Sequence, residues 1–302
     1  MRAWIKNLVV SMILSVVIWG WLVSWRFGFI IVTAIFIHEY GHFYWMKKEG
    51  IKNRDMLFIP PFGAVARSMD QWPSRGAESR IALAGPASGL ISLLPFLLLW
   101  LLYGSPIFAA STILICYLNL FNLLTPISIL DGGRVIKSVL ASIEKRLEYG
   151  FYIFSLAIII VAFITGYLSP FFALLVFYFT WTEFRNLLSG RRKLKNLSVL
   201  ILATRKNFQD PRVMGETLSG ETLGSLISLR SAFLQIIGYK SIEDMEENQK
   251  NLKLMVDPPS MSIREIALSI LFFILIATPY ILTLFWLKNY MSITLGSVYS
   301  NF

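Results

Sequence analysis

Long apolar segments recur along the 302-residue chain, separated by short connections or by stretches rich in lysine and arginine. A transmembrane helix needs about 20 predominantly apolar residues. Seven segments meet this requirement approximately: 7–25, 27–46, 81–103, 107–127, 150–168, 170–187 and 266–287. The pattern therefore predicts an all-α polytopic membrane protein with about seven transmembrane helices.

The composition agrees with this prediction and changes how the net charge is interpreted. Hydrophobic residues make up 56% of the chain and charged residues 15%, against about 25% charged residues in soluble domains. With a cytoplasmic N-terminus, all but two of the 28 Lys and Arg residues lie on the cytoplasmic side, the exceptions being Arg26 and Lys288. This distribution follows the positive-inside rule. The net charge of +10 thus indicates membrane orientation and no nucleic-acid partner. We expect a multi-pass protein of the cell membrane, in contact with the lipid bilayer, with its C-terminus outside.

A polar stretch interrupts the apolar pattern between residues 190 and 263. Part of it, residues 221–239, has apolar residues at helical spacing, with a stripe formed by Leu226, Leu229, Phe233 and Ile236. Such a stripe is typical of a core-facing helix, and the following Asp257-Pro258-Pro259 should end any helix before the last span. We expect a small cytoplasmic helical segment of unknown role, at which a regulatory partner could bind.

The candidate chemistry lies in the second apolar segment, which contains the sequence HEYGH at residues 38–42. His38 and His42 are the only two histidines in the chain. Residues i and i+4 lie on one face of an α-helix, so both imidazoles can reach one metal ion, with Glu39 beside them as a general base. Ionisable residues inside a membrane span are costly unless they face a partner or a cavity. The motif therefore predicts a catalytic zinc site.

A catalytic zinc ion usually has three protein ligands, and without a third histidine the remaining ligand is a carboxylate or the lone Cys116. Asp131 is the only acidic residue between Glu78 and Glu144, and Gly132-Gly133 behind it permit a sharp turn and a close backbone approach. An ordinary Asp-Gly turn at the membrane surface is the alternative interpretation. At 1.5 Å per residue, His42 and His38 lie roughly 8 and 15 Å below the cytoplasmic end of their span. Asp131 follows the fourth span at the same side, so its depth favours the ligand role.

Together, HEYGH and the sequence from Asn122 through Pro126 to Leu130-Asp131-Gly132-Gly133 resemble the site-2 protease family of intramembrane zinc metalloproteases. The resemblance covers about residues 27–140. It implies Zn2+ held by His38, His42 and Asp131, with Glu39 as the general base. It also implies cleavage of membrane protein substrates within a transmembrane helix near the cytoplasm, as in regulated intramembrane proteolysis.

Further residues resemble parts of the same family. Residues 58–67 look like its membrane-associated β-hairpin, which implies that Phe62, Gly63 and Ala64 contact an extended substrate. The family's substrate-side asparagine corresponds to Asn122, although the interval to Pro126 is one residue longer here, and Asn119 is the competing candidate. Residues 84–89, AGPASG, resemble the family's A-G-P motif in the third span, and small residues at these positions favour close helix packing.

Two other functions are open on the sequence. A membrane zinc protease of the prenyl-peptidase kind could use Glu183 as its third ligand, since that residue also lies near a cytoplasmic span end. A non-proteolytic scaffold or regulator could retain a structural metal, although it would not need Glu39. The domain organisation that we expect is as follows: an N-terminal transmembrane helix (1–26), a catalytic membrane core (27–140), additional transmembrane helices (141–189), the cytoplasmic segment (190–263) and a C-terminal transmembrane helix with a short tail (264–302).

Overall fold

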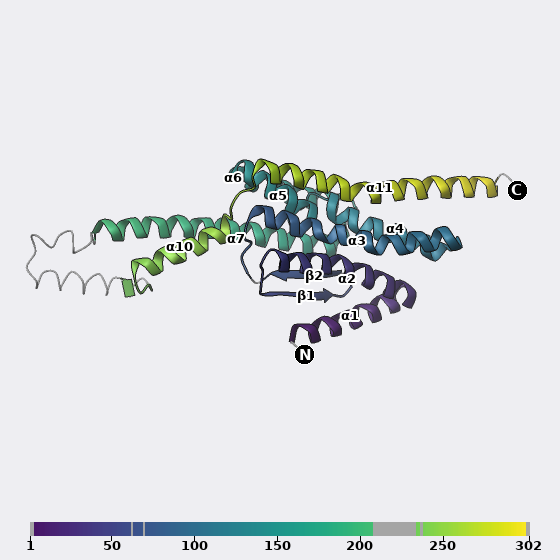
Figure 1. Cartoon of the computed structure of the whole chain (residues 1–302), viewed down its shortest axis with the longest axis horizontal. Helices are drawn as coiled ribbons and strands as arrows, with labels where there is room; N and C mark the ends of the chain where they lie inside the picture. Colours follow the sequence, from purple (N-terminus) through teal and green to yellow (C-terminus); the bar gives the residue numbers. More distant parts are fainter. Residues whose placement is uncertain (1–2, 62, 69, 208–233, 236–237, 300–302) are drawn as a thin grey trace, which may run out of the picture. The chain divides into compact units, whose positions relative to one another are not determined.

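The computed structural model describes residues 3–61, 63–68, 70–207, 234–235 and 238–299. Most of the described chain is helical, with one pair of antiparallel strands (Figure 1). The elements are α1 (Ala3–Leu22), α2 (Trp25–Lys48), β1 (Arg54–Ile59), β2 (Gly63–Ser68), α3 (Arg75–Tyr103), α4 (Pro106–Leu124), α5 (Asp131–Ile143), α6 (Lys145–Ile164), α7 (Pro170–Asn207), α10 (Ile242–Val256) and α11 (Ile263–Tyr299). They form two compact units, one of residues 1–181 with 259–302 and one of residues 182–258.

Among the described residues, five helices are long and apolar enough to cross a membrane. They are Trp4–Leu22, Arg75–Tyr103, Pro106–Leu124, Lys145–Ile164 and Ile263–Lys288. Segments 27–46 and 170–187 are also helical, within α2 and α7, but polar side chains such as those of HEYGH lower their hydropathy. Five of the seven predicted spans therefore coincide with helices that could cross a membrane, whereas spans 27–46 and 170–187, the total of seven and the membrane topology stay predictions.

Local sequence signals explain where the helices of the first unit begin and end. Ser24 and Ser74 precede α2 and α3. Each serine hydroxyl accepts a hydrogen bond from the backbone N–H three residues later, as N-cap side chains do. Gly104 ends α3 in the left-handed conformation (φ 62°), which glycine adopts without strain. Pro106 then starts α4, where its missing N–H is not needed.

The predicted hairpin is present and is longer than the sequence indicated. Strands β1 and β2 pair antiparallel from Arg54 opposite Ser68 to Ile59 opposite Gly63. Buried Met56 and Phe58 of β1 pack in a cluster with residues of α1 and α2, and Ala66 of β2 packs in another with Met46 of α2. The hairpin thereby lies against α2 (Figure 1), and Ala66 contacts the half of α2 that carries HEYGH.

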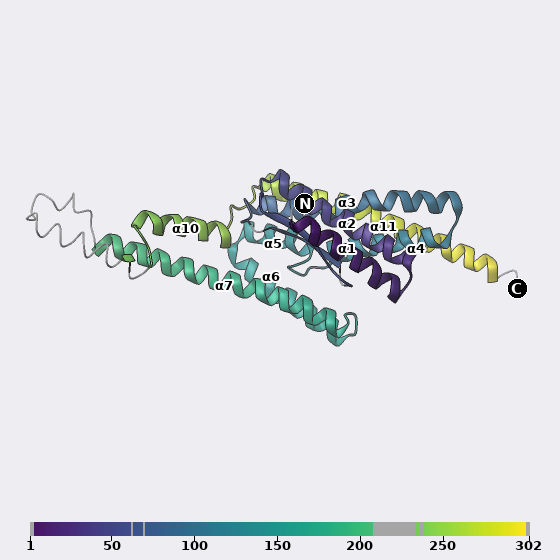
Figure 2. The same cartoon turned by 90° about the horizontal axis from the view of Figure 1, so that it is seen from below.

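The main hydrophobic core lies around α3, which packs against α2, α4, α5 and α11 (Figure 2). Its buried members include Leu83 and Leu93 of α3, Ile115 and Leu123 of α4, and Tyr280 of α11. The Tyr280 hydroxyl donates a 2.6 Å hydrogen bond to the carbonyl of Pro86 in α3. Cys116 belongs to this core, as expected for a small apolar side chain.

Helices α2 and α3 approach each other closely at small residues. A Cβ atom on Gly41 would overlap the carbonyl oxygen of Ala84 and the hydroxyl of Ser88. That hydroxyl donates a 2.8 Å hydrogen bond across the interface to the carbonyl of Ile37. The packing role predicted for the AGPASG sequence is consistent with these contacts.

Residues 131–133 begin a helix, α5, where the sequence suggested a sharp turn. Gly132 and Gly133 have no positive φ, so their conformation does not require glycine. The limited space does require glycine, because a Cβ atom on Gly132 would overlap the carbonyl oxygen of Leu123, and one on Gly133 would overlap that of Ile127. The close backbone approach is thus present, and the sharp turn is not.

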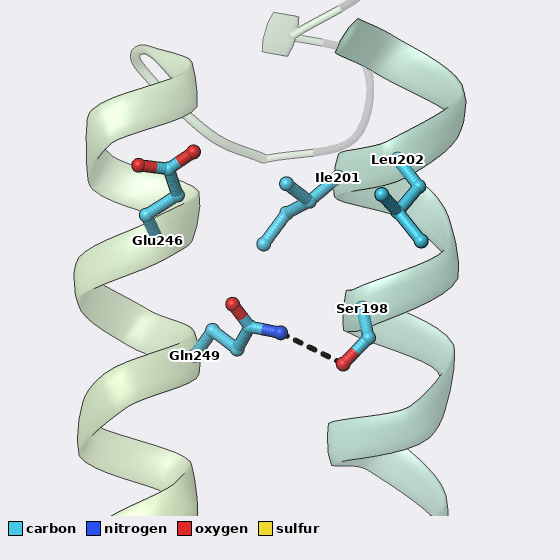
Figure 3. A pocket seen from close by; sticks show the side chains of 5 residues that line it. All are labelled: Ser198, Ile201, Leu202, Glu246 and Gln249. Atoms are coloured by element: carbon cyan, nitrogen blue, oxygen red, sulfur yellow. Dashed lines mark hydrogen bonds between the residues drawn. The ribbon is translucent and has the colours of Figure 1, made fainter. Parts of the chain in front are cut away.

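In the unit of residues 182–258, the second half of α7 lies beside α10. Buried Leu197 and Ile201 of α7 pack with Ile242 and Met245 of α10. A surface pocket of about 370 Å3 between the two helices is lined by Ser198, Ile201, Leu202, Glu246 and Gln249, and the Gln249 amide donates to the Ser198 hydroxyl at 2.7 Å (Figure 3). The apolar stripe of residues 226, 229, 233 and 236 lies outside the described residues.

The contact between α2 and α3 gives the first testable prediction. Gly41→Ala should destabilise the protein by about 1–3 kcal/mol, the usual effect of overpacking, because the new methyl group displaces one helix from the other. Gly150→Ala is the control, since a Cβ atom there meets nothing within 4 Å. Thermal unfolding in detergent micelles should show a lower Tm for the first variant only. Equal melting temperatures would contradict the tight packing at Gly41.

Candidate metal centre

Three side chains from two helices converge at one point in the first unit. His38 and His42 lie one turn apart on α2, and Asp131 is the first residue of α5. The Asp131 carboxylate lies 3.1 Å from Nε2 of His38 and 3.2 Å from Nε2 of His42, and the two Nε2 atoms are 3.2 Å apart. All three residues are buried, with at most 8% of the surface exposed. In the described part of the chain, they are the group of three that could hold a metal ion.

Hydrogen bonds to the opposite ring nitrogens determine which atom of each imidazole faces the centre. Nδ1 of His42 lies 2.7 Å from the carbonyl oxygen of Ile81, and Nδ1 of His38 lies 2.9 Å from Oδ1 of Asn119. Both oxygens can only accept, so each Nδ1 carries the proton in the neutral ring. Each Nε2 then presents a lone pair to the centre, which is the usual state of a metal-ligating histidine.

The donor set fits zinc. Two imidazole nitrogens and a carboxylate oxygen are typical ligands of a catalytic zinc site, and ligand atoms 2.0–2.1 Å from a tetrahedral ion lie about 3.3 Å apart. The observed separations of 3.1–3.2 Å are close to this value. Without a cation, the lone pairs of both Nε2 atoms and the Asp131 carboxylate would repel one another in a buried place.

Gly85 of α3 provides the space for this centre. A Cβ atom at residue 85 would overlap Nε2 of His42 and come within 2.7 Å of Nε2 of His38. The two imidazoles therefore lie directly against the backbone of α3. The sequence signal for this role was the AGPASG motif, from which only helix packing had been inferred.

Glu39, the acidic residue of HEYGH, is half-buried and faces the hairpin. Its Oε2 atom accepts a 2.7 Å hydrogen bond from the backbone N–H of Ala66 in β2. In an antiparallel pair, alternate residues direct their N–H groups away from the partner strand, so Ala66 directs its own to the outer edge of β2. Glu39 thus lies between the ligand cluster and this edge, a contact that the sequence did not reveal.

Both candidate asparagines of α4 contact the ligands. Asn119 is buried, accepts from His38 as described and donates from its amide nitrogen to the Ile115 carbonyl at 2.8 Å. Asn122 is half-buried, and its amide nitrogen donates to Oδ2 of Asp131 at 2.7 Å. Asn122 Oδ1 also accepts from the Asp131 backbone N–H at 3.3 Å. Asn119 thus orients one ligand, and Asn122 holds the start of α5.

The other residues singled out from the sequence lie elsewhere or outside the described chain. Gly63 and Ala64 begin β2, the strand that continues to Ala66, and Phe62 lies outside the described residues. Glu183 belongs to the unit of residues 182–258. Among the described residues the ligand group contains Asp131 and not Glu183.

The orientation of His38 gives the second testable prediction. Asn119→Leu should weaken zinc binding about 10–100-fold, the usual effect of removing a hydrogen-bond partner of a ligating histidine, because Nδ1 of His38 loses its acceptor. Asn119→Asp keeps an acceptor oxygen and should bind zinc more tightly than the leucine variant. Competition with a chromogenic chelator measures both affinities. An unchanged affinity in Asn119→Leu would contradict the orienting role.

Comparison with known proteins relates this centre to a group of proteases. Residues 26–114 match the model of Peptidase family M50. A zinc metalloprotease of Methanocaldococcus jannaschii is 33% identical over 135 residues, which are 43% of this chain and 37% of the relative. The chain thus spans less than half of that relative's length. The resemblance predicted from the sequence is confirmed for this part of the chain, which is similar to peptidase family M50, the site-2 protease family.

Proposed function

We propose that this protein is an intramembrane zinc metalloprotease, which hydrolyses peptide bonds within or near the transmembrane segments of other membrane proteins. The observation that carries the proposal is the convergence of His38, His42 and Asp131, with Glu39 beside them, in a chain whose described residues include five membrane-capable helices. The relationship to family M50 supports it. Regulated intramembrane proteolysis in the cell membrane, with a cytoplasmic N-terminus, is part of the proposal.

In this proposal, the two Nε2 atoms and the Asp131 carboxylate hold the zinc ion. When bound, zinc acts as a Lewis acid that polarises the scissile carbonyl group and activates water at neutral pH. The hydrogen bonds from Nδ1 of His38 and His42 keep both rings in the ligating orientation. Burial of all three ligands by α2, α3 and α5 excludes other water from them.

Glu39 is the general base of the proposed reaction. Its carboxylate accepts a proton from the attacking water while the water oxygen bonds to the scissile carbonyl carbon, and it then delivers that proton to the amide nitrogen as the C–N bond breaks. The N–H of Ala66 keeps the carboxylate next to the ligand cluster. A scaffold with a purely structural metal would not need a carboxylate in this place.

The outer edge of β2 is the proposed binding site for the substrate backbone. A transmembrane helix conceals its carbonyls in internal hydrogen bonds, so the segment to be cleaved must unwind, and an extended segment can pair with an exposed strand edge. Because Ala66 directs its N–H to Glu39, the same edge passes beside the base. Gly63 and Ala64 continue this edge. Asn122, half-buried at the ligands, is the proposed side chain that contacts the substrate.

The ligand set can be tested directly, and this is the third prediction. Purified wild-type protein should contain about one zinc ion per chain, the usual content of a catalytic site. Asp131→Ala should lose it because a ligand is removed, and Glu39→Gln should retain it while losing cleavage of a membrane protein substrate. Glu183→Gln is the control and should keep both zinc and activity. Elemental analysis and a cleavage assay in detergent supply the two measurements.

Each rival function has its own outcome in this experiment. Zinc retained in Asp131→Ala and lost in Glu183→Gln would support a protease of the prenyl-peptidase kind. Zinc in the wild type with equal cleavage in Glu39→Gln would remove the proposed base. A scaffold predicts bound zinc and no cleavage by any variant, whichever membrane protein is supplied.

The role of the β2 edge gives the fourth prediction. Ala64 lies two residues before Ala66, so its N–H points to the same side of the strand. Proline removes this N–H and is tolerated at strand edges. Ala64→Pro should therefore keep wild-type zinc content but raise KM for a membrane protein substrate, because one backbone hydrogen bond to it is lost. Unchanged KM in a variant with full zinc content would argue against strand pairing at this edge.

A further inference from the structure

A network of four buried charged side chains lies in the first unit, away from the ligands. Nζ of Lys137 in α5 is 2.9 Å from Oε1 of Glu78 in α3, and the Ser138 hydroxyl donates to Oε2 of Glu78 at 3.1 Å. Arg75 of α3 makes two bonds, of 2.8 and 2.9 Å, to the carboxylate of Glu148 in α6. The side chains of the four charged residues are at most 5% exposed.

The network contains two positive and two negative groups, so its charges balance. Arg75 also lies 3.6 Å from Glu78, which links the two ion pairs. Burying even a paired charge is unfavourable unless the geometry is good, and well-packed apolar residues often serve stability equally well. The presence of the network is therefore weak evidence that its role is to stabilise the fold. What it specifies is which residues of α3 face which residues of α5 and α6.

The contacts of α3 and α5 recur at the same spacing. Glu78 and Gly85 are seven residues apart on α3, and Ser138 and Asp131 are seven residues apart on α5. Seven residues are about two helical turns, or 10.5 Å, and bring side chains back to one face. Glu78 meets Ser138 at one end. At the other end, Gly85 lies against the imidazoles that contact Asp131.

This spacing makes Glu78 a reference point for Asp131. If α5 slid along α3 by one turn, its residues would move about 5.4 Å, far more than the separations of 3.1–3.2 Å within the ligand cluster allow. Residues 125–130 before α5 contain no regular helix or strand that would prevent such movement. The Asn122 contacts oppose such a movement at Asp131 itself, and the bonds from Lys137 and Ser138 to Glu78 oppose it two turns further along α5.

We propose that Glu78, through Lys137 and Ser138, is the positioning residue that fixes the register of α5 along α3 and so brings Asp131 to the two histidines. The inference rests on the proposed metal centre and goes beyond it, since none of the three residues touches the ligands. Arg75 and Glu148 form the neighbouring pair, which holds α6 to α3 and has no direct part in the register of α5.

Two matched double variants test this inference, and their expected zinc affinities are the fifth prediction. Glu78→Gln with Lys137→Met removes the pair between α3 and α5, and Arg75→Met with Glu148→Gln removes the pair between α3 and α6. Each removes one positive and one negative charge, so neither leaves a buried ion without a counter-charge. The measurements are zinc content, zinc affinity by chelator competition, and Tm in detergent.

We expect the first double variant to bind zinc about tenfold or more weakly than the wild type, as when outer partners of metal ligands are removed. The second double variant should keep wild-type zinc affinity, even if its Tm falls as far as that of the first double variant. A third variant, Ser138→Ala, retains all charges and should weaken zinc binding about fivefold, the effect of one net hydrogen bond. It decides the question if the first double variant does not fold.

Several results would overturn the inference. Wild-type zinc affinity in a folded Glu78→Gln/Lys137→Met protein would do so, and so would an equal loss of affinity in both double variants. If that double variant does not fold, wild-type zinc affinity in Ser138→Ala would overturn the inference. Absence of zinc from the wild type would contradict the proposed function itself, and the inference with it. Wild-type zinc content therefore separates the two failures.

Discussion

Three electron-pair donors must meet in a buried place, and most of the first unit is arranged around that requirement. His38 and His42 lie on one helix, but Asp131 follows 89 residues after His42 and has to be brought to them. Small residues make this possible. Gly41 and Gly85 let α2 and α3 approach until the imidazoles touch the backbone of α3, and Gly132 lets α5 begin against the carbonyl of Leu123.

Polar partners then complete what close packing begins. Asn119 and the Ile81 carbonyl hold the rings from behind, and the Ala66 N–H holds Glu39 from the side of the hairpin. Each partner comes from a different element, so the centre is assembled from α2, α3, α4, α5 and β2 together. The same hairpin contact places a strand edge beside Glu39, the proposed base, where the proposed unwound substrate would need it.

Membrane proteins keep buried charges where they serve a purpose, because an apolar interior makes them costly. In the first unit, the ligand cluster is one such place and the network around Glu78 is another. Their seven-residue spacing along both α3 and α5 suggests a common function: Glu78 sets the register, and Asp131 is placed by it. The apolar faces of the spans provide burial, but they do not distinguish one helical register from the next.

HEYGH, Asp131 and the apolar runs could be interpreted without a structure, because periodicity and ligand chemistry are local properties of the chain. Helix formation and the candidate zinc ligands followed from them, whereas the hairpin was predicted from the resemblance to a family. Other features depended on distant residues that meet only in the folded chain. Among these are the helical start of α5 at Asp131, the ring partners of His38 and His42, and the bond from Ala66 to Glu39. Gly85 shows the difference most clearly: its place in AGPASG predicts close packing, but only the tertiary structure shows that two imidazoles occupy the space that its missing side chain leaves.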